Sequence, residues 1–219
     1  MSEFKNKKYL LFDLDGTITD SGPAIISSFK YSIKEYGEVG LTDSDYSSIV
    51  GPPLRDSYMR LLGVDGITAW DLVLKYREFY NAGGMFDCTV YDGMVELLKA
   101  LKDAGKILAV ATSKPEEQSL IILKHFDLLK YFDVVAGDDQ NCTRSNKAMI
   151  IEYALDKLDN PDPNEVVMIG DRSYDMLGAI KMGVTPIGVA FGYGSRKELT
   201  ESGAEYIANK ATDLIEVLI

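Results

Sequence analysis

Two aspartates close an apolar run near the N-terminus, and they are the first residues in the chain that could do chemistry. The sequence YLLFDLDGT sets Asp13 and Asp15 two positions apart. Burying an isolated carboxylate costs several kcal/mol unless a partner compensates the charge. We therefore expect both aspartates at the end of a buried strand, where they meet solvent, a metal ion and a ligand.

Three further polar clusters follow apolar runs in the same way. Thr112 and Ser113 come after the second run, Lys147 opens the helix after the third, and Asp171 and Asp175 follow the fourth. Ligands of open α/β sheets bind outside the carboxyl ends of the strands. The four clusters are therefore expected to converge at one edge of a sheet.

The charges of these clusters indicate what they bind. The four aspartates would carry up to four negative charges, against one positive charge on Lys147. So many carboxylates cannot stay ionised together without a cation. Mg²⁺ prefers carboxylate and carbonyl oxygens and often takes substrate phosphate as a further ligand. The backbone amides of residues 14–17 and the Thr112 hydroxyl could then hold phosphoryl oxygens.

The sequence lacks the motifs that histidine, cysteine and serine nucleophiles require. The single histidine, His125, has no Ser or Cys motif near it. A cysteine-phosphatase loop needs Arg six residues after Cys, but Met94 and Ala148 follow Cys88 and Cys142 at that distance. The GxxxxGK[ST], GxGxxG and GxSxG motifs are absent from the sequence. Carboxylates are left as the candidate nucleophiles.

Composition limits the class of protein. The chain has 219 residues, 46% of them hydrophobic, and a formal charge of −11. This suits one large domain or a core with an insertion, and it gives no basic face for nucleic acid. The N-terminus has no signal-peptide pattern, and no apolar run has the length of a membrane span. The two cysteines stand far apart in the sequence, so we expect a reduced, cytoplasmic protein. From the charge and the apolar runs we expect no nucleic-acid and no membrane partner.

Strand and helix patterns alternate along most of the chain. Val- and Ile-rich runs predict buried parallel strands at 9–13, 107–112, 132–137, 166–171 and 186–190, with a possible edge strand at 206–209. Patterns of period 3.6 predict helices at 93–105, 116–126, 146–158 and 174–183. This alternation predicts an α/β fold with a doubly wound, Rossmann-like parallel sheet.

One interval departs from the alternation. Residues 19–88 carry only helical patterns and no convincing strand, which predicts a small all-helical insertion after the first strand. The domains are therefore expected to be an α/β core of residues 1–18 and 89–219 and an all-helical insertion of residues 19–88. Asp138 and Asp139, after the third strand, are expected in a solvated loop.

The motifs DLDGT, ATSK, SNK and GDRSYD, in this order, resemble those of the haloacid dehalogenase superfamily of aspartate-nucleophile phosphatases. The helical insertion resembles that superfamily's smaller caps, and the likeness covers essentially the whole chain. GPPLRDSY, GYGSRKEL and GAEYI resemble its phosphoglycolate phosphatase and 5′-nucleotidase-like branch. Dehalogenases lack the second aspartate, so Asp15 favours phosphoryl chemistry.

The resemblance implies catalytic and phosphate-binding roles. Asp13 would attack phosphorus to form an aspartyl-phosphate, and Asp15 would act first as general acid and then as general base. Thr112 would hydrogen-bond the phosphoryl group, and Lys147 would neutralise charge on Asp13 and the phosphate. Gly16 and Ser113 complete the expected phosphate-binding set, although Ser113, like its neighbour Lys114, is also expected at the rim of the site.

The resemblance also implies the metal site and the reaction. Asp13, the main-chain carbonyl of Asp15, Asp171 and Asp175 would bind Mg²⁺, with Asp175 acting directly or through water. The expected function is a magnesium-dependent phosphomonoesterase for a small metabolite, with phosphoglycolate or a nucleoside monophosphate favoured. Arg55, in GPPLRDSY, is the first candidate for a cap residue that contacts substrate.

Two other functions remain open on the sequence. A phosphotransferase of the β-phosphoglucomutase type would use the same residues, and a non-catalytic phosphate-ligand sensor would bind without turnover. The sequence leaves the substrate and the oligomeric state open.

Overall fold

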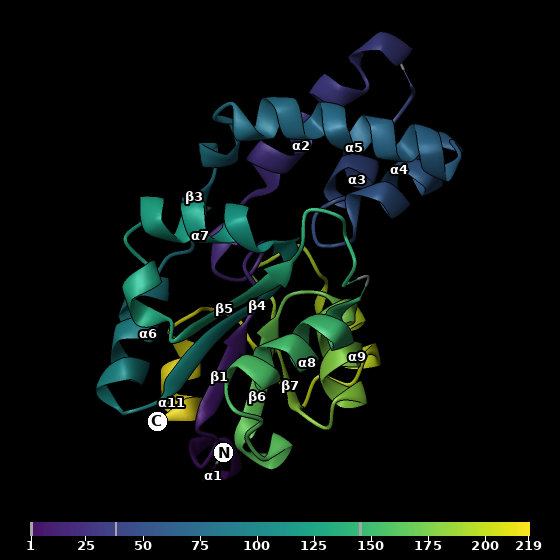
Figure 1. Cartoon of the computed structure of the whole chain (residues 1–219). Coiled ribbons are helices and arrows are strands. Elements are labelled where there is room, and N and C mark those ends of the chain that lie inside the picture. The colour runs from purple at the N-terminus through teal and green to yellow at the C-terminus, as the bar shows by residue number, and fades with distance from the viewer. Residues whose placement is uncertain (1, 38, 145) are drawn as a thin grey trace. The chain divides into compact units, whose positions relative to one another are not determined.

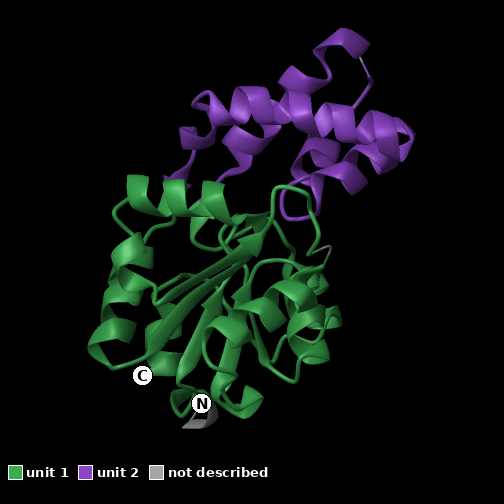
Figure 2. Cartoon of the chain, viewed as in Figure 1, with its two compact units in different colours: residues 1–19, 90–219 green, residues 20–89 purple. Residues whose placement is uncertain are grey.

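The computed structural model describes residues 2–37, 39–144 and 146–219 and divides into two compact units. Unit 1 consists of Met1–Thr19 and Val90–Ile219, and unit 2 of Asp20–Thr89 (Figure 2). The sequence-based division set its boundaries after residues 18 and 88, and the role of unit 2 as a cap stays a prediction.

Unit 1 contains a six-stranded sheet in the order β5-β4-β1-β6-β7-β8, with every neighbouring pair parallel. The strands are β1 (Tyr9–Phe12), β4 (Ile107–Pro115), β5 (Val134–Asp138), β6 (Val166–Gly170), β7 (Thr185–Val189) and β8 (Tyr206–Ala208). This confirms the predicted fold class. The first strand lies in the middle of the sheet, because Tyr9 pairs with Ile107 on one side and Val166 on the other.

Helices cover both faces of this sheet (Figure 1). The helices of unit 1 are α1 (Ser2–Lys5), α6 (Met94–Asp103), α7 (Glu116–His125), α8 (Lys147–Lys157), α9 (Ser173–Lys181), α10 (Arg196–Glu201) and α11 (Asp213–Leu218), with short 3-10 turns η3 (Leu129–Tyr131) and η4 (Pro163–Glu165). Leu10 and Phe12 pack with α6 and α11, whereas Leu11 packs with α8 and α9. Side chains of a strand alternate between faces, so a strand buried on both faces must be apolar throughout.

Unit 2 is helical, as expected. It contains α2 (Gly22–Ser32), η1 (Lys34–Tyr36), α3 (Asp43–Ser47), α4 (Leu54–Leu62), α5 (Gly66–Asn81) and η2 (Gly84–Phe86). Helices α2 and α4 both pack on α5, and the rings of Phe29 and Tyr58 stack with centroids 4.5 Å apart. The Asp65 side chain accepts the amide hydrogens of Ile67 and Thr68, which fixes the start of α5.

The expectation that residues 19–88 contain no strand is wrong at their first two positions. Strand β2 (Thr19–Asp20) pairs with β3 (Thr89–Val90) to form a separate two-stranded sheet. Each strand has two residues, too short for any alternation of apolar and polar side chains to register. The two connections between the units are therefore held together by this pairing.

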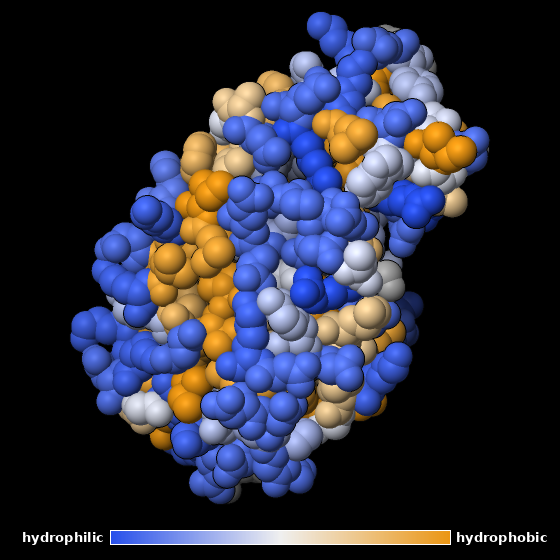
Figure 3. Space-filling view, in the orientation of Figure 1, coloured by the Kyte–Doolittle hydropathy of each residue, from blue (hydrophilic) through white to orange (hydrophobic). Residues whose placement is uncertain are grey.

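The surface agrees with the composition. The face drawn in Figure 3 is mostly hydrophilic, in keeping with a chain in which 26% of the residues are charged. Polar side chains are expected at such a surface, so those that are buried in the core indicate where a functional site lies. Asp13, Asp15, Lys147, Asp171 and Asp175 are all at most 8% exposed.

Candidate active site

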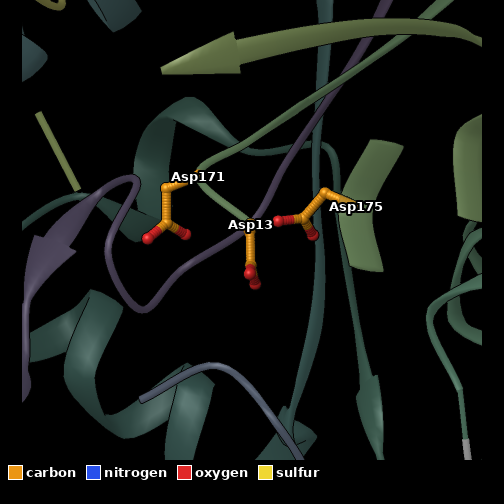
Figure 4. Close-up of side chains that lie close together, drawn as sticks. All are labelled: Asp13, Asp171 and Asp175. Atoms are coloured by element: carbon orange, nitrogen blue, oxygen red, sulfur yellow. The ribbon is translucent and has the colours of Figure 1, made fainter. Parts of the chain in front are cut away.

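Three aspartates meet at the carboxyl ends of β1 and β6. Asp13 follows β1, Asp171 follows β6, and Asp175 lies in the first turn of α9. One carboxylate oxygen from each lies within 4.8 Å of the others, and Figure 4 shows the three side chains next to one another. Strands β1 and β6 are neighbours in the sheet, so residues 158 positions apart in the chain end up side by side.

Glycines make room for these carboxylates. A Cβ at Gly170 would lie 2.2 Å from the Asp175 carboxyl carbon, and one at Gly16 would lie 2.3 Å from Asp171 Oδ2. Gly16 also has φ +83°, a conformation that residues with a side chain rarely adopt. Its amide donates to the Thr19 carbonyl at 2.8 Å, so the tight turn accounts for this glycine, and its predicted contact with phosphate stays a prediction.

Lys147 is the cation of the cluster. Asn146 caps α8, and Lys147 Nζ lies 3.0 Å from Asp13 Oδ2, 2.7 Å from Asp175 Oδ1 and 3.1 Å from the Ala111 carbonyl oxygen. Burial alone would lower the pKa of Lys147, but the charges of Asp13 and Asp175 outweigh burial and raise it. The ammonium therefore stays protonated and partly neutralises the cluster.

The carboxylates remain under-compensated by this single cation. Burial, together with the nearby charges of Asp175 and Asp15, raises the pKa of Asp13 from 3.8 to about 6, although Lys147 opposes the rise. Burial and the charges of Asp175 and Asp13 also raise the pKa of Asp171 well above its usual value. Three buried carboxylates with hard oxygen donors and an excess of negative charge fit a divalent cation.

Asp15 has a cation of its own. The residue as a whole is 8% exposed, and Lys114 Nζ lies 2.7 Å from Asp15 Oδ2. The Lys114 side chain is only 6% exposed, so this residue lies inside the site and the expectation of a rim position is wrong. The other carboxylate oxygen, Asp15 Oδ1, is buried without a hydrogen-bond partner among the residues that the structure describes.

Thr112 and Ser113 lie near the end of β4. Thr112 is 1% exposed, and its hydroxyl accepts the amide hydrogen of Lys114 at 3.2 Å. It directly follows Ala111, whose carbonyl oxygen accepts a hydrogen bond from Lys147, so Thr112 borders the charged cluster. Ser113 is half-buried. Their predicted roles toward phosphate remain predictions.

The segment 192–194 completes the support of Asp171, and sequence reasoning missed it. The Tyr193 amide donates to Asp171 Oδ2 at 2.7 Å. A Cβ at Gly192 would lie 2.2 Å from the Gly16 carbonyl oxygen, and one at Gly194 would lie 1.8 Å from the Asp171 carbonyl oxygen. The paired glycines of GYGS were the available signal, because glycine is required where two backbones approach this closely.

Two other residues lie outside this cluster. Arg55 is an exposed residue of α4 in unit 2, where its Nε donates to the Gly66 carbonyl at 3.2 Å. Asp138 is buried, and its carboxylate accepts the amide hydrogens of Asp139 and Arg144, so the expectation of a solvated loop is wrong for Asp138. Burial raises the pKa of Asp138 despite these hydrogen bonds.

Comparison with known proteins identifies the family. The sequence model of the Haloacid dehalogenase-like hydrolase family matches residues 10–189. The chain belongs to this family. It is 38% identical over 193 residues to a 5′-nucleotidase of Pseudomonas aeruginosa, covering 87% of this chain and 86% of the relative. It is also 36% identical over 209 residues to the tyrosine-protein kinase PtkA of Mycobacterium tuberculosis, covering 95% of this chain and 70% of that protein.

A crystal structure of a predicted phosphatase from Clostridium acetobutylicum matches with a TM-score of 0.91 and 44% identity, over 96% of this chain and 97% of that one. These likenesses confirm the resemblance drawn from the motifs, and with it the prediction of a haloacid dehalogenase-type enzyme of the phosphatase kind. Among the described residues, every helix is too short or too polar to cross a membrane.

Proposed function

We propose that this enzyme is a magnesium-dependent phosphomonoesterase that acts on a small phosphorylated metabolite through an aspartyl-phosphate on Asp13. The observation that carries the proposal is the cluster of Asp13, Asp171 and Asp175, in which Lys147 pairs with Asp13 and Asp175, with Asp15 two residues beyond Asp13. Phosphoryl transfer depends mainly on positioning and on neutralising charge, and this cluster can supply both.

The carboxylates of Asp13, Asp171 and Asp175 and the main-chain carbonyl of Asp15 would hold the metal ion. Magnesium, when bound, supplies positive charge that offsets these carboxylates and the oxygens of the phosphoryl group. The raised pKa values of Asp13 and Asp171 support this assignment, because they reflect uncompensated negative charge in a buried site.

The first half-reaction uses Asp13 and Asp15. A carboxylate oxygen of Asp13 attacks phosphorus, and the bond from phosphorus to the ester oxygen breaks. Asp15 donates its proton to that oxygen, so the product leaves as an alcohol. Lys147, 3.0 Å from Asp13 Oδ2, favours the ionised form of the nucleophile, and the Leu14 amide donates to Asp13 Oδ1 at 2.7 Å, which orients the carboxylate.

The second half-reaction releases phosphate. The Asp15 carboxylate takes a proton from a water molecule, whose oxygen attacks phosphorus. The bond from phosphorus to the Asp13 oxygen breaks, inorganic phosphate leaves, and Asp13 returns to its carboxylate form. Asp15 is then protonated again and ready for the next ester.

The substrate class rests on the family and on unit 2. We propose that unit 2, which is small and helical, acts as a cap that limits the substrate to a small metabolite, and the likeness to a 5′-nucleotidase supports a nucleoside monophosphate as well as phosphoglycolate. Arg55 remains the proposed cap residue for the part of the substrate away from phosphorus. We propose that the enzyme works in the cytoplasm.

A phosphotransferase is the second candidate. It is favoured by the likeness to a protein that is named a tyrosine kinase, which is a class of phosphotransferase. It would use Asp13 in the same way but pass the phosphoryl group to a hydroxyl of a sugar or a tyrosine. A phosphatase releases inorganic phosphate, whereas a transferase leaves it bound to the acceptor.

The test is a screen of phosphate esters with magnesium, scored by the release of inorganic phosphate. The esters are phosphoglycolate, nucleoside monophosphates, sugar phosphates and a phosphotyrosyl peptide, and Asp13→Asn serves as the inactive control. We expect the small metabolites to exceed the peptide in kcat/KM. Interconversion of sugar phosphates without free phosphate, or a preference for the peptide, would refute the proposal.

A further inference from the structure

Lys114 has no role in the proposed reaction, although it forms an ion pair with Asp15. Lys114 Nζ lies 2.7 Å from Asp15 Oδ2, and the two side chains are only 6% and 11% exposed. Both residues belong to unit 1. An exposed ion pair contributes little, but a buried one holds its partners in a defined geometry.

An irregularity of β4 directs Lys114 to this position. The parallel pairing of β4 with β5 runs from Ala111 opposite Ala136 to Pro115 opposite Asp138, so four steps on β4 match two on β5. Bulges of this kind re-aim side chains and occur next to active sites. The adjoining strand leaves room for the bulge because residue 137 is glycine. A Cβ added at this position would lie 2.6 Å from the Lys114 carbonyl oxygen.

The two oxygens of Asp15 are thereby made different. Oδ2 is held by Lys114, whereas Oδ1 is buried and has no hydrogen-bond partner among the described residues. A buried polar atom without a partner is costly, so such an atom in a site indicates a partner that arrives with the ligand. Oδ1 is thus the oxygen left to exchange a proton with the ester oxygen or with water.

We propose that Lys114 is a positioning residue, which holds Asp15 by Oδ2 so that Oδ1 faces the oxygen of the leaving group. This inference rests on the proposed function. It assigns Lys114 to the departure of the alcohol and not to the binding of the phosphoryl group. The loss of Lys114 should therefore harm esters that need a proton on departure more than esters that do not.

The experiment compares kcat/KM for two esters in the magnesium-loaded enzyme. One is phosphoglycolate or AMP, whichever the wild type hydrolyses faster, and its alkoxide must be protonated. The other is p-nitrophenyl phosphate, whose nitrophenolate is a stable anion. General acid catalysis contributes about 10²–10⁴-fold, so we expect Lys114→Met to lose at least about tenfold more on the alkyl ester than on p-nitrophenyl phosphate.

Two variants control for the interpretation. Lys114→Arg keeps a positive donor and should recover part of the activity toward the alkyl ester. Lys102→Met removes a lysine of unit 1 that pairs with Asp133 at 2.7 Å, and it should leave both esters unchanged. Asp15→Asn should show the same preference for p-nitrophenyl phosphate as Lys114→Met.

The outcomes separate this inference from the proposed function. Equal losses on both esters, unchanged activity in Lys114→Met, or no recovery in Lys114→Arg would overturn the positioning role while the phosphomonoesterase stands. If Asp15→Asn lacked the preference, the assignment of Asp15 as the acid would fail. A wild type that released phosphate from neither ester would overturn both.

Discussion

Replacing Asp171 with Asn tests the electrostatics of the metal cluster in the absence of the metal. Burial and the charges of Asp175 and Asp13 raise the pKa of Asp171, so its ionised form destabilises the metal-free fold. Asn is nearly the same size, and its carbonyl oxygen can still accept the Tyr193 amide hydrogen, now bonded at 2.7 Å. We therefore expect metal-free Asp171→Asn to be more stable than the metal-free wild type above pH 7.

The magnitude follows from Asp13, whose pKa rises from 3.8 to about 6 on folding. Between these values the folded state binds more protons than the unfolded state, so the stability of the metal-free protein falls as pH rises through this window. At about 1.36 kcal/mol for each pKa unit, the loss is about 3 kcal/mol. Burial and the charges of Asp175 and Asp13 raise the pKa of Asp171 as well, so removing its charge should act in the opposite direction to this loss and raise the Tm of the metal-free protein, by roughly 2–4 °C for each kcal/mol recovered in a chain of this size.

The assay is thermal unfolding in EDTA and in saturating magnesium. The wild type should gain stability from magnesium, because an ion that binds only the folded state raises Tm. Asp171→Asn should have a higher Tm than the wild type in EDTA, and magnesium should raise the Tm of this variant only a little. Asp138→Asn is the matched control, since it neutralises a buried carboxyl outside the cluster and should keep the full magnesium response. A variant that melts below the wild type in EDTA and still responds fully to magnesium would refute this reasoning.

Three further predictions follow from the site. Gly194→Ala should raise the magnesium concentration needed for half-maximal activity, because its Cβ would lie 1.8 Å from the Asp171 carbonyl oxygen; an unchanged magnesium titration would count against this. Thr112→Val should lower kcat/KM by about tenfold, because we propose that the Thr112 hydroxyl hydrogen-bonds the phosphoryl group, and it should also lower Tm, because the same hydroxyl accepts the Lys114 amide hydrogen; steady-state kinetics and thermal melting check the two effects separately. Calcium should restore an EDTA-treated enzyme less well than magnesium, because its larger and looser coordination sphere misplaces Asp13, and equal phosphate release with the two ions would contradict that.

The sequence was sufficient to predict the parallel sheet and to predict that the polar residues after its strands lie close together. Parallel strands buried on both faces carry continuous apolar runs, so the run before Asp13 and the run before Asp171 could be recognised directly. The rule that ligands bind at the carboxyl ends of such strands then brought Asp13, Lys147 and Asp171 together. Neither step depends on the exact ends of the helices.

The residues that sequence reasoning misjudged depend on backbone geometry. Lys114 was expected at the rim, but a bulge in β4 turns its side chain toward Asp15. The Tyr193 contact with Asp171 comes from a main-chain amide, which any residue type can supply. Asp138 is buried at the end of β5, where the amides of Asp139 and Arg144 donate to its carboxylate, and a sequence does not show that main-chain amides reach this side chain.

The covalent role of Asp13 is the central claim, and the Asp15→Asn variant allows a direct measurement. With p-nitrophenyl phosphate the leaving group needs no proton, but hydrolysis of the aspartyl-phosphate still needs the base, so the intermediate should accumulate. The measurement is mass spectrometry of the acid-quenched variant after mixing with magnesium and this ester. We expect one phosphoryl group per chain, on the peptide that contains Asp13, with a matching burst of nitrophenolate. Release of nitrophenolate without phosphorylated protein at any time, or a phosphoryl group on another peptide, would contradict the account.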